Sequence, residues 1–392
     1  MVAALIVESE AGPFGGVLVE SQGGLSVGEG RSWLRMRFAP QTILPAAPRP
    51  PRRGEGLRGL IMRLKEIGEF GFIDRIRNGC LVRSASVIKG IGDDCCVFKT
   101  SPGLVTLFTT DMLVENIHFI RGAITPYKLG RKSVAVNISD IAAMGGTPRE
   151  AVVSIAIPDT LEVEYVDAVY DGMKSIAKEY DVNLLGGDTT ASPEHLVVNI
   201  ALVGEALEEE ILYRSGARVG DVVFVTGTVG SSAAGLDMIL TKRAFEEAGP
   251  LLDAHHDPRP HVKAGRIIAG LKVASALIDV SDGVAADLGH ICKESGVGAI
   301  IAEASIPMEN LFRRYCDQFE LDPLHLALHV GEDYVLLGTV PGRSVDRLAG
   351  ALKSAGCEFF AIGTIAAEAG LRLRGSDDSL RTIPPGGWDH FT

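Results

Sequence analysis

Short apolar runs alternate with stretches of helical periodicity along most of the chain, beginning near residue 80. The stretch 131–146 repeats apolar residues at intervals of three or four, from Val134 to Met144, which predicts a helix. Residues 162–180 predict a second helix, whereas the apolar run 150–158 is β-like and ends at a proline. Further strands are predicted within the segments 104–111, 195–206, 222–235, 276–291, 331–340 and 358–365. This alternation predicts an α/β (α+β) fold with mixed sheets.

The same alternation of strand-like and helical segments occurs in two halves of the chain, which are separated by the turn-rich, polar stretch 212–221. We therefore predict an N-terminal domain over residues 62–210 and a C-terminal α/β domain over 211–392. The two halves suggest a paired architecture, although their sequences contain no strict repeat.

The first sixty residues differ in composition from the rest of the chain. They contain several arginines and a cluster of prolines but no lysine and no aspartate, and helical periodicity starts only after Met62. They also lack the basic start of a secretory signal. We expect residues 1–61 to be a poorly ordered extension, for which translation from an upstream start codon is one explanation.

Charge and cysteine content narrow the class of protein. The net charge of −12 argues against nucleic acid as a partner, because binding to phosphate backbones needs a basic face. No apolar run approaches the roughly 20 residues that span a bilayer, so no membrane association is predicted. The six cysteines form no C-x-x-C pair, which argues against a zinc site or a disulfide framework. These features predict a cytoplasmic protein.

Aspartates recur at the predicted junctions between elements. Five stretches share this property: GDD with Asp93 and Asp94, TTD with Asp111, SDIAAMGG with Asp140, GGDTT with Asp188, and DVSDG with Asp279 and Asp282. A single such aspartate is usually a turn or N-cap residue. Five stretches of the same chemistry favour a shared site.

Carboxylates gathered in one place need a cation. Two unit charges roughly 4 Å apart repel by about 4 kcal/mol at an effective dielectric constant near 20. Ligands that are all oxygen suit Mg²⁺, and the hydroxyls of Thr109, Thr110 and Ser281 can complete its shell. The glycines Gly187 and Gly283 would let backbone amides approach a polyphosphate.

Other catalytic motifs do not occur in the sequence. The P-loop, the H-E-x-x-H metal motif and the G-x-S-x-G nucleophile motif do not occur, which excludes the enzyme classes that depend on them. The adjacent His255 and His256 stand close to Pro258, and we interpret them as part of an exposed loop rather than as metal ligands.

The order of the sequence blocks resembles that of the thiamine-monophosphate kinase family. The blocks are GEFGFIDRI, GIGDDCCV, TTDMLVENIHF, VNISDIAAMGGTP, LLGGDTT, YRSGARVGD, DVSDG, GEDY and GGWDHF, which together cover about Leu64 to Phe391. The resemblance implies phosphorylation of thiamine monophosphate by ATP, with several Mg²⁺ ions and no covalent nucleophile. It also implies a homodimer in which mixed N-terminal sheets and their helices form a shared barrel.

The resemblance also implies roles for individual residues. Metal ligands would be Asp94, Thr109, Thr110, Asp111, Asp140, Asp188, Asp279 and Asp282. ATP contacts would come from Tyr170, Gly187, Asp188, Arg214 and Ser281, and substrate contacts from His118, Glu332 and Trp388. Simpler interpretations stay open: Tyr170 as a core residue, Arg214 as a surface ion pair, Trp388 as a tail aromatic, and Asp93 as a turn cap.

Two other functions compete with the kinase. One is a different ATP-dependent synthetase of the same superfamily, of the selenophosphate or aminoimidazole-ribonucleotide type. The other is a non-catalytic protein that binds nucleotide or metal, although such a scaffold would be expected to have lost some of the five acidic stretches.

Overall fold

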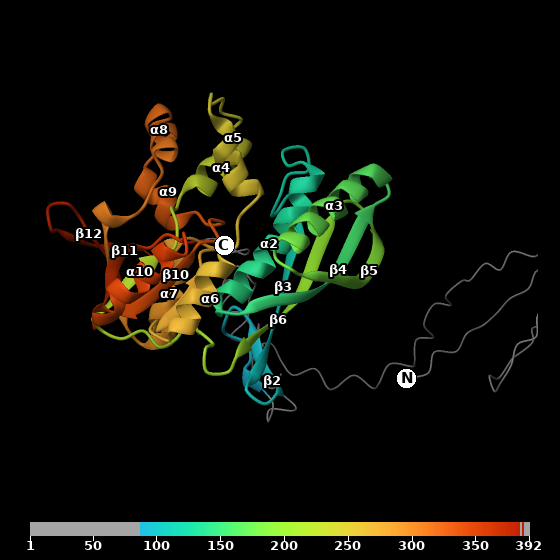
Figure 1. Ribbon diagram of the computed structural model, residues 1–392. Coiled ribbons are helices and arrows are strands. Elements are labelled where there is room, and N and C mark those ends of the chain that lie inside the picture. Colours follow the sequence, from blue (N-terminus) through green and yellow to red (C-terminus); the bar gives the residue numbers. More distant parts are fainter. Residues whose placement is uncertain (1–86, 385, 388–392) are drawn as a thin grey trace, which may run out of the picture. The chain divides into compact units, whose positions relative to one another are not determined.

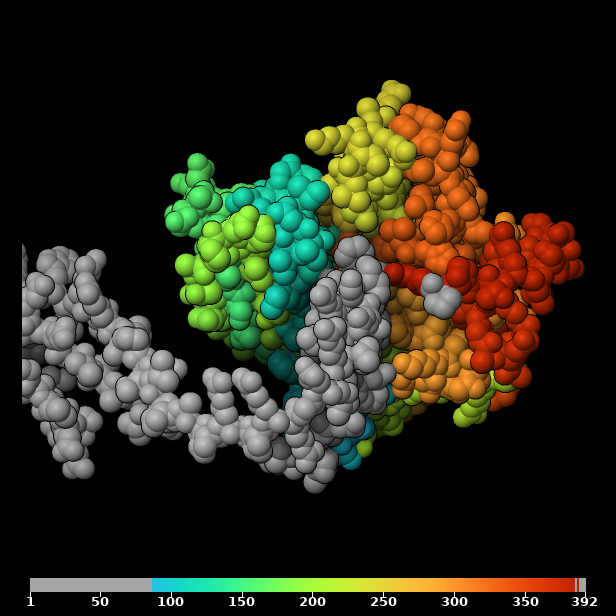
Figure 2. Space-filling view, turned by 180° about the vertical axis from the view of Figure 1, so that it is seen from behind, coloured from blue at the N-terminus to red at the C-terminus, as the bar shows by residue number. Residues whose placement is uncertain are grey.

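The computed structural model describes residues 87–384, 386 and 387, all of which fall within the compact unit Met62–Thr392 (Figure 1). The predicted extension 1–61, the helical pattern that follows Met62, and Trp388 lie outside the described residues. The described residues form a mixed α/β fold with two sheets, as the alternating pattern predicts. In Figure 2, residues 87–207 and residues 221–384 gather in separate regions of the surface.

The first sheet has six strands in the order β1-β2-β3-β6-β4-β5. All neighbouring strands are antiparallel except β4 and β5, which run parallel, so the predicted mixed sheet is confirmed. The strands are β1 (Val87–Lys89), β2 (Cys96–Ser101), β3 (Leu104–Val114), β4 (Thr147–Pro158), β5 (Asn183–Ser192) and β6 (Val197–Leu207). Its helices are α2 (Pro126–Ala143) and α3 (Val163–Glu179).

Helix α2 begins at a strong sequence signal. The hydroxyl of Thr125 accepts a hydrogen bond from the backbone amide of Lys128, and a proline follows at the first helical position. The helix packs against α3, β3 and β6, and it also contacts α6 and β8 of the second half. Helix α2 is therefore shared between the packing of both sheets.

The second sheet has seven strands in the order β13-β12-β9-β11-β7-β10-β8, of which only β12 and β9 pair in parallel. The strands are β7 (Asp221–Val225), β8 (Ala276–Asp279), β9 (Gly298–Ala302), β10 (Leu336–Pro341), β11 (Phe360–Ala366), β12 (Gly370–Arg374) and β13 (Leu380–Ile383). The helices are α4 (Ser231–Thr241), α5 (Ala248–His256), α6 (Val262–Leu271), α7 (Val284–Ser295), α8 (Asn310–Gln318), α9 (Pro323–His329) and α10 (Val345–Ser354).

Both faces of the second sheet are covered, which explains why β7 is apolar without alternation. Val223 and Val225 pack in a core with residues of α4, α7 and α8. Phe224 points the other way, into a core with residues of α6 and α10. That second core includes Ala142 and Ala143 at the end of α2, so it joins the two halves.

Candidate active site

Residues from both halves line a cavity of about 520 Å³. The residues come from the segment before β2, from β3 and α2, and from β8, the loop after it and α7. Seven of them are aspartates: Asp93, Asp94, Asp111, Asp140, Asp279, Asp282 and Asp287. The cavity therefore gathers four of the five acidic stretches that the sequence analysis identified.

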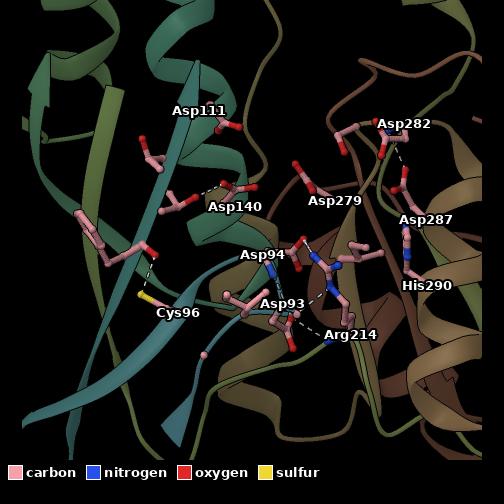
Figure 3. A pocket seen from close by; sticks show the side chains of 18 residues that line it. Asp93, Asp94, Cys96, Asp111, Asp140, Arg214, Asp279, Asp282, Asp287 and His290 are labelled. Carbon is pink, nitrogen blue, oxygen red and sulfur yellow. Dashed lines mark hydrogen bonds and ion pairs between the residues drawn. The ribbon is translucent and has the colours of Figure 1, made fainter. Parts of the chain in front are cut away.

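Three of these aspartates converge. Asp94, Asp140 and Asp279 each offer an oxygen within 4.8 Å of the others, and Figure 3 shows their side chains facing a common space. Asp140 lies on α2, Asp279 ends β8, and Asp94 stands just before β2. Residues far apart in the chain thus supply a single oxygen cluster.

Hydroxyl groups orient two members of the cluster. Thr109 Oγ1 donates a hydrogen bond to Asp140 Oδ2, and Ser139 Oγ donates to Asp279 Oδ2 at 2.5 Å. The oxygen Oδ2 of Asp94 is buried without a hydrogen-bond partner among the described residues. A buried carboxylate oxygen without a donor fits a cation ligand, because such an oxygen is otherwise costly.

The electrostatics of the cluster also fit a cation. Burial raises the pKa of Asp94 to about 7, against the opposing charge of Arg214 and with contributions from neighbouring aspartates. Burial also raises the pKa of Asp279 to about 6. The pKa of Asp140 lies well above its usual value because of burial and then the nearby carboxylates. These groups resist ionisation together unless positive charge is added.

Arg214 lies in the segment between the two sheets and supplies one such charge. Its Nη2 is 2.7 Å from Asp94 Oδ1, and its backbone amide donates to Asp93 Oδ1 at 3.2 Å. Asp93 also forms an ion pair with Lys89. Because Arg214 is largely buried, its interpretation as a surface ion pair is wrong. Asp93 accepts a hydrogen bond from the backbone amide of Asp94, as expected of a residue that caps a turn.

A second group of possible ligands lies at the same cavity, and of its three members only Asp282 was predicted from the sequence. Asp282, Asp287 and His290 each offer a ligand atom within 4.8 Å of the others. Asp287 is buried on α7, where its carboxylate accepts from the backbone amides of Asp282 and Gly283. Its signal was an acidic residue in the first turn of a helix that is otherwise apolar on that face.

Three predicted ligand positions are not in loops. Asp111 lies within β3, Asp140 within α2 and Asp188 within β5, so the expectation of acidic junctions is wrong for these stretches. Strand β3 continues through its polar residues, and Thr109, Thr110 and Asp111 all line the cavity.

Asp188, predicted as a metal ligand and as an ATP contact, does not join the acidic residues of the cavity. Together with Tyr170 and Gly187 it lines a second pocket of about 450 Å³, formed by α3, β4 and β5. Strand β5 is the edge strand beyond β4, and Asp188 is exposed there. Tyr170 both lines this pocket and packs against the core, so its two interpretations are compatible.

Of the other residues predicted for the site, some line the cavity and some lie elsewhere in the fold. Ser281 lines the cavity. The Thr110 hydroxyl donates to the backbone carbonyl of Ile200, and His118 Nδ1 accepts from a backbone amide. Glu332 lies in the segment between α9 and β10 and forms an ion pair with Lys132.

The fold and the two-part cavity define an AIR synthase related protein. The N-terminal domain family of that description matches residues 92–206, and the C-terminal domain family matches residues 218–376. Within this class, the chain belongs to the thiamine-monophosphate kinase family.

Individual relatives support this assignment. The thiamine-monophosphate kinase of Aquifex aeolicus is 36% identical over 330 residues, which cover 84% of this chain and 100% of the relative. The enzyme of the same name from Bacillus subtilis is 38% identical over 268 residues, covering 66% and 79% respectively. A solved structure described as AaThiL complexed with AMPPCP and TMP has a TM-score of 0.74 at 35% identity, covering 85% of this chain and 100% of that one.

Proposed function

We propose that this chain transfers the terminal phosphoryl group of ATP to thiamine monophosphate and so forms thiamine diphosphate. The proposal rests above all on the convergence of Asp94, Asp140 and Asp279 in one cavity. Family membership and the bound AMPPCP and TMP of the AaThiL structure support the two substrates.

The acidic cavity fits Mg²⁺. We propose Asp94, Asp111, Asp140, Asp279 and Asp282 as its ligands, with the hydroxyls of Thr109 and Thr110 as further candidates. Bound Mg²⁺ would neutralise the charge of the phosphates and of the aspartates around them. The chain itself fixes the ligand oxygens, through Thr109 at Asp140 and Ser139 at Asp279.

The transfer needs positioning more than covalent chemistry. Both substrates carry phosphates, so their mutual repulsion must be offset while the reacting oxygens are brought into line. We propose direct in-line transfer with ATP contacts from Arg214 and Ser281 at the cavity, and from Tyr170, Gly187 and Asp188 at the second pocket. Trapping a phosphorylated protein from labelled ATP would contradict this route.

Acceptor recognition is assigned to His118, Glu332 and Trp388. The thiazolium ring is a cation, so a carboxylate and an aromatic face are suitable partners for it.

We further propose that the protein is a cytoplasmic homodimer whose first sheets form a shared barrel. The helices of the first sheet lie on the face that carries Leu107 and Thr109, whereas Phe108, Met112 and Val152 are exposed on the opposite face. An exposed apolar sheet face of this kind fits a subunit interface. Among the helices that the structure describes, none combines the length and the hydropathy of a membrane span.

The domain limits are part of the proposal. Residues 62–210 would bind ATP and Mg²⁺, residues 211–392 would complete the site, and residues 1–61 would not be needed for it.

ADP release by the full chain tests the function. We expect ADP with thiamine monophosphate and Mg²⁺, and none with free thiamine or an aminoimidazole precursor. Release with the aminoimidazole precursor instead would identify a different synthetase of the superfamily. ATP binding that is indifferent to the acceptor, with no ADP formed, would identify a scaffold.

A further inference from the structure

Lys132 is a buried lysine outside the metal cavity. It lies on α2 with 0% of its surface exposed, and its Nζ is 3.0 Å from Oε2 of Glu332. A lysine is rarely buried to this extent unless its charge is paired. The pair also joins the two halves of the chain, because α2 belongs to the first sheet and Glu332 precedes β10 of the second.

A second polar group lies beside the same carboxylate oxygen. His255 Nδ1 lies 3.0 Å from Glu332 Oε2, and the Ser232 hydroxyl lies 3.1 Å from the same Nδ1. Burial, followed by the charge of Lys132, lowers the pKa of His255 well below its usual value, so the ring is neutral. The neutral imidazole therefore contacts the carboxylate oxygen through Nδ1 as a polar neighbour and not as an ion-pair partner.

His255 therefore has a different environment from the one that the sequence suggested. It lies with His256 at the buried end of α5, so the interpretation of an exposed loop is wrong. The nine residues of α5 are too few to show a helical period in the sequence.

The backbone at Glu332 is fixed as well. Glu332 has a φ of 66° and Tyr334 a φ of 51°, both in the left-handed region that side chains other than glycine rarely adopt. The amide of Glu332 donates to Ser281 O at 2.8 Å, and the amide of Tyr334 donates to Val280 O at 2.9 Å. Strained conformations of this kind persist where the surroundings determine them, often beside functional sites.

Close packing reinforces this backbone position. A Cβ on Gly331 would lie 1.9 Å from Ser281 O, so only glycine fits against the loop that lines the cavity. The segment 331–334 is thus held directly against Ser281 and its neighbours.

We propose that Lys132 and His255 are positioning residues that hold Oε2 of Glu332, so that Oε1 is presented to the acceptor substrate. Oε1 accepts no hydrogen bond from the described part of the chain, and the Glu332 side chain is 24% exposed. This inference rests on the proposed function. It makes Lys132 and His255 responsible for the orientation of the Glu332 carboxylate, and neither of the two is proposed as a substrate contact.

The Lys132→Met variant tests the inference through substrate affinities. It keeps the length of the side chain but removes the charge, and it should raise the KM for thiamine monophosphate by about tenfold or more. The KM for ATP and kcat should stay within about threefold of wild type, because the ATP contacts are untouched. If Glu332 is first replaced by glutamine, the carboxylate that Lys132 holds is absent. Adding Lys132→Met to the E332Q variant should then change the KM for thiamine monophosphate little.

Lys128→Met is the matched control. Lys128 lies one turn earlier on α2 and pairs with Asp253 on α5, so its loss also removes a contact between the two halves. Its KM for thiamine monophosphate should equal that of wild type. A similar rise in Lys128→Met would mean that α2 acts only as a general clamp, which would overturn the inference.

Substitutions at His255 give an independent test if Lys132→Met fails to fold. His255→Asn keeps an N–H near the position of Nδ1 and should retain most acceptor affinity, whereas His255→Ala should raise the KM for thiamine monophosphate.

The outcomes separate the inference from the function on which it rests. An active wild type whose Lys132→Met variant shows an unchanged acceptor KM, or an equal rise for both substrates, overturns the inference alone. A wild type that releases no ADP with thiamine monophosphate overturns the proposed function and this inference with it.

Discussion

The guanidinium of Arg214 lies 2.7 Å from Asp94 Oδ1, although the two residues are 120 positions apart. Through this contact the segment between the sheets reaches the residues just before β2, where Asp93 also accepts from the Arg214 backbone amide. Burial lowers the pKa of Arg214, but the charges of Asp94 and Asp93 together with the hydrogen bond to Asp94 raise it above its usual value. Arg214 is therefore charged, and it is an internal counter-charge of the acidic cavity.

Replacing Arg214 by methionine should destabilise the protein without Mg²⁺. The change leaves Asp94 buried beside other carboxylates and removes its cation, which typically costs about 3 kcal/mol. Urea denaturation in EDTA should show this loss, and added Mg²⁺ should recover part of it. Arg214→Lys, which keeps the charge, should lose less. Equal stability of Arg214→Met and wild type in EDTA would argue against a role for Arg214 as counter-charge.

Asp140→Asn should separate activity from stability. The asparagine keeps the size of the side chain but removes a proposed ligand, so turnover should fall by at least about 100-fold. Stability in EDTA should not fall, because the raised pKa of Asp140 already disfavours its charge. Asp346→Asn, an exposed aspartate at the start of α10, is the control and should behave as wild type in both measurements.

Buried aspartates, in the cavity and at Asp333 beside the Gly230 amide, also predict how stability changes with pH. Burial raises the pKa of Asp94 and of Asp333 to about 7, while the pKa values of Asp140 and Asp287 lie well above the usual range. Near pH 7 the folded protein therefore holds protons that the unfolded chain, with aspartate pKa values near 3.9, has released. The free energy of unfolding should accordingly fall as pH rises from about 7 to about 8.

Buried histidines do not cancel this slope. Burial lowers the pKa of His256, His261 and His290 to about 4, so the extra protons that these histidines bind in the unfolded chain, where their pKa is about 6.5, are mostly lost between pH 7 and pH 8. Urea midpoints in EDTA should decrease between pH 7 and pH 8, and Mg²⁺ should reduce the decrease because it favours the ionised carboxylates. A midpoint that rises with pH in EDTA would contradict the assignment.

Two helical glycines should respond in opposite directions to alanine. A Cβ on Gly130 of α2 would lie 1.8 Å from the carbonyl oxygen of Val169 on α3, so Gly130→Ala should destabilise by about 2 kcal/mol or more. Gly289 of α7 has nothing within 4 Å of its Cβ position, so Gly289→Ala should stabilise by about 0.5–1 kcal/mol. Thermal or urea denaturation of the pair checks this. Equal effects would mean that α2 and α3 can move apart freely.

Local sequence patterns predicted the helices and strands better than they predicted which residues form the active site. The apolar spacing from Val134 onward indicated α2 but not its first turn, which begins at Pro126 and is defined by the Thr125 cap rather than by apolar residues. Lys132 was missed because a lysine in a helix normally faces solvent, and its burial depends on Glu332, 200 residues away.

The position of Asp188 shows the same limit. The GGDTT stretch has the chemistry of the other acidic stretches, but the strand order places β5 at the edge of its sheet and Asp188 in the second pocket. Strand order depends on long-range pairing, which the local sequence does not reveal.

Met112→Asp should convert the proposed dimer into a monomer. Met112 is 52% exposed on the sheet face that also carries Phe108 and Val152, and a charge there would have to be buried in the shared barrel. Sedimentation velocity should show a dimer for wild type and a monomer for Met112→Asp. Leu240→Asp is the control, because Leu240 is 63% exposed on α4, and it should remain a dimer. A wild-type chain that sediments as a monomer at micromolar concentration would contradict the barrel, and the exposed face would then need a different partner.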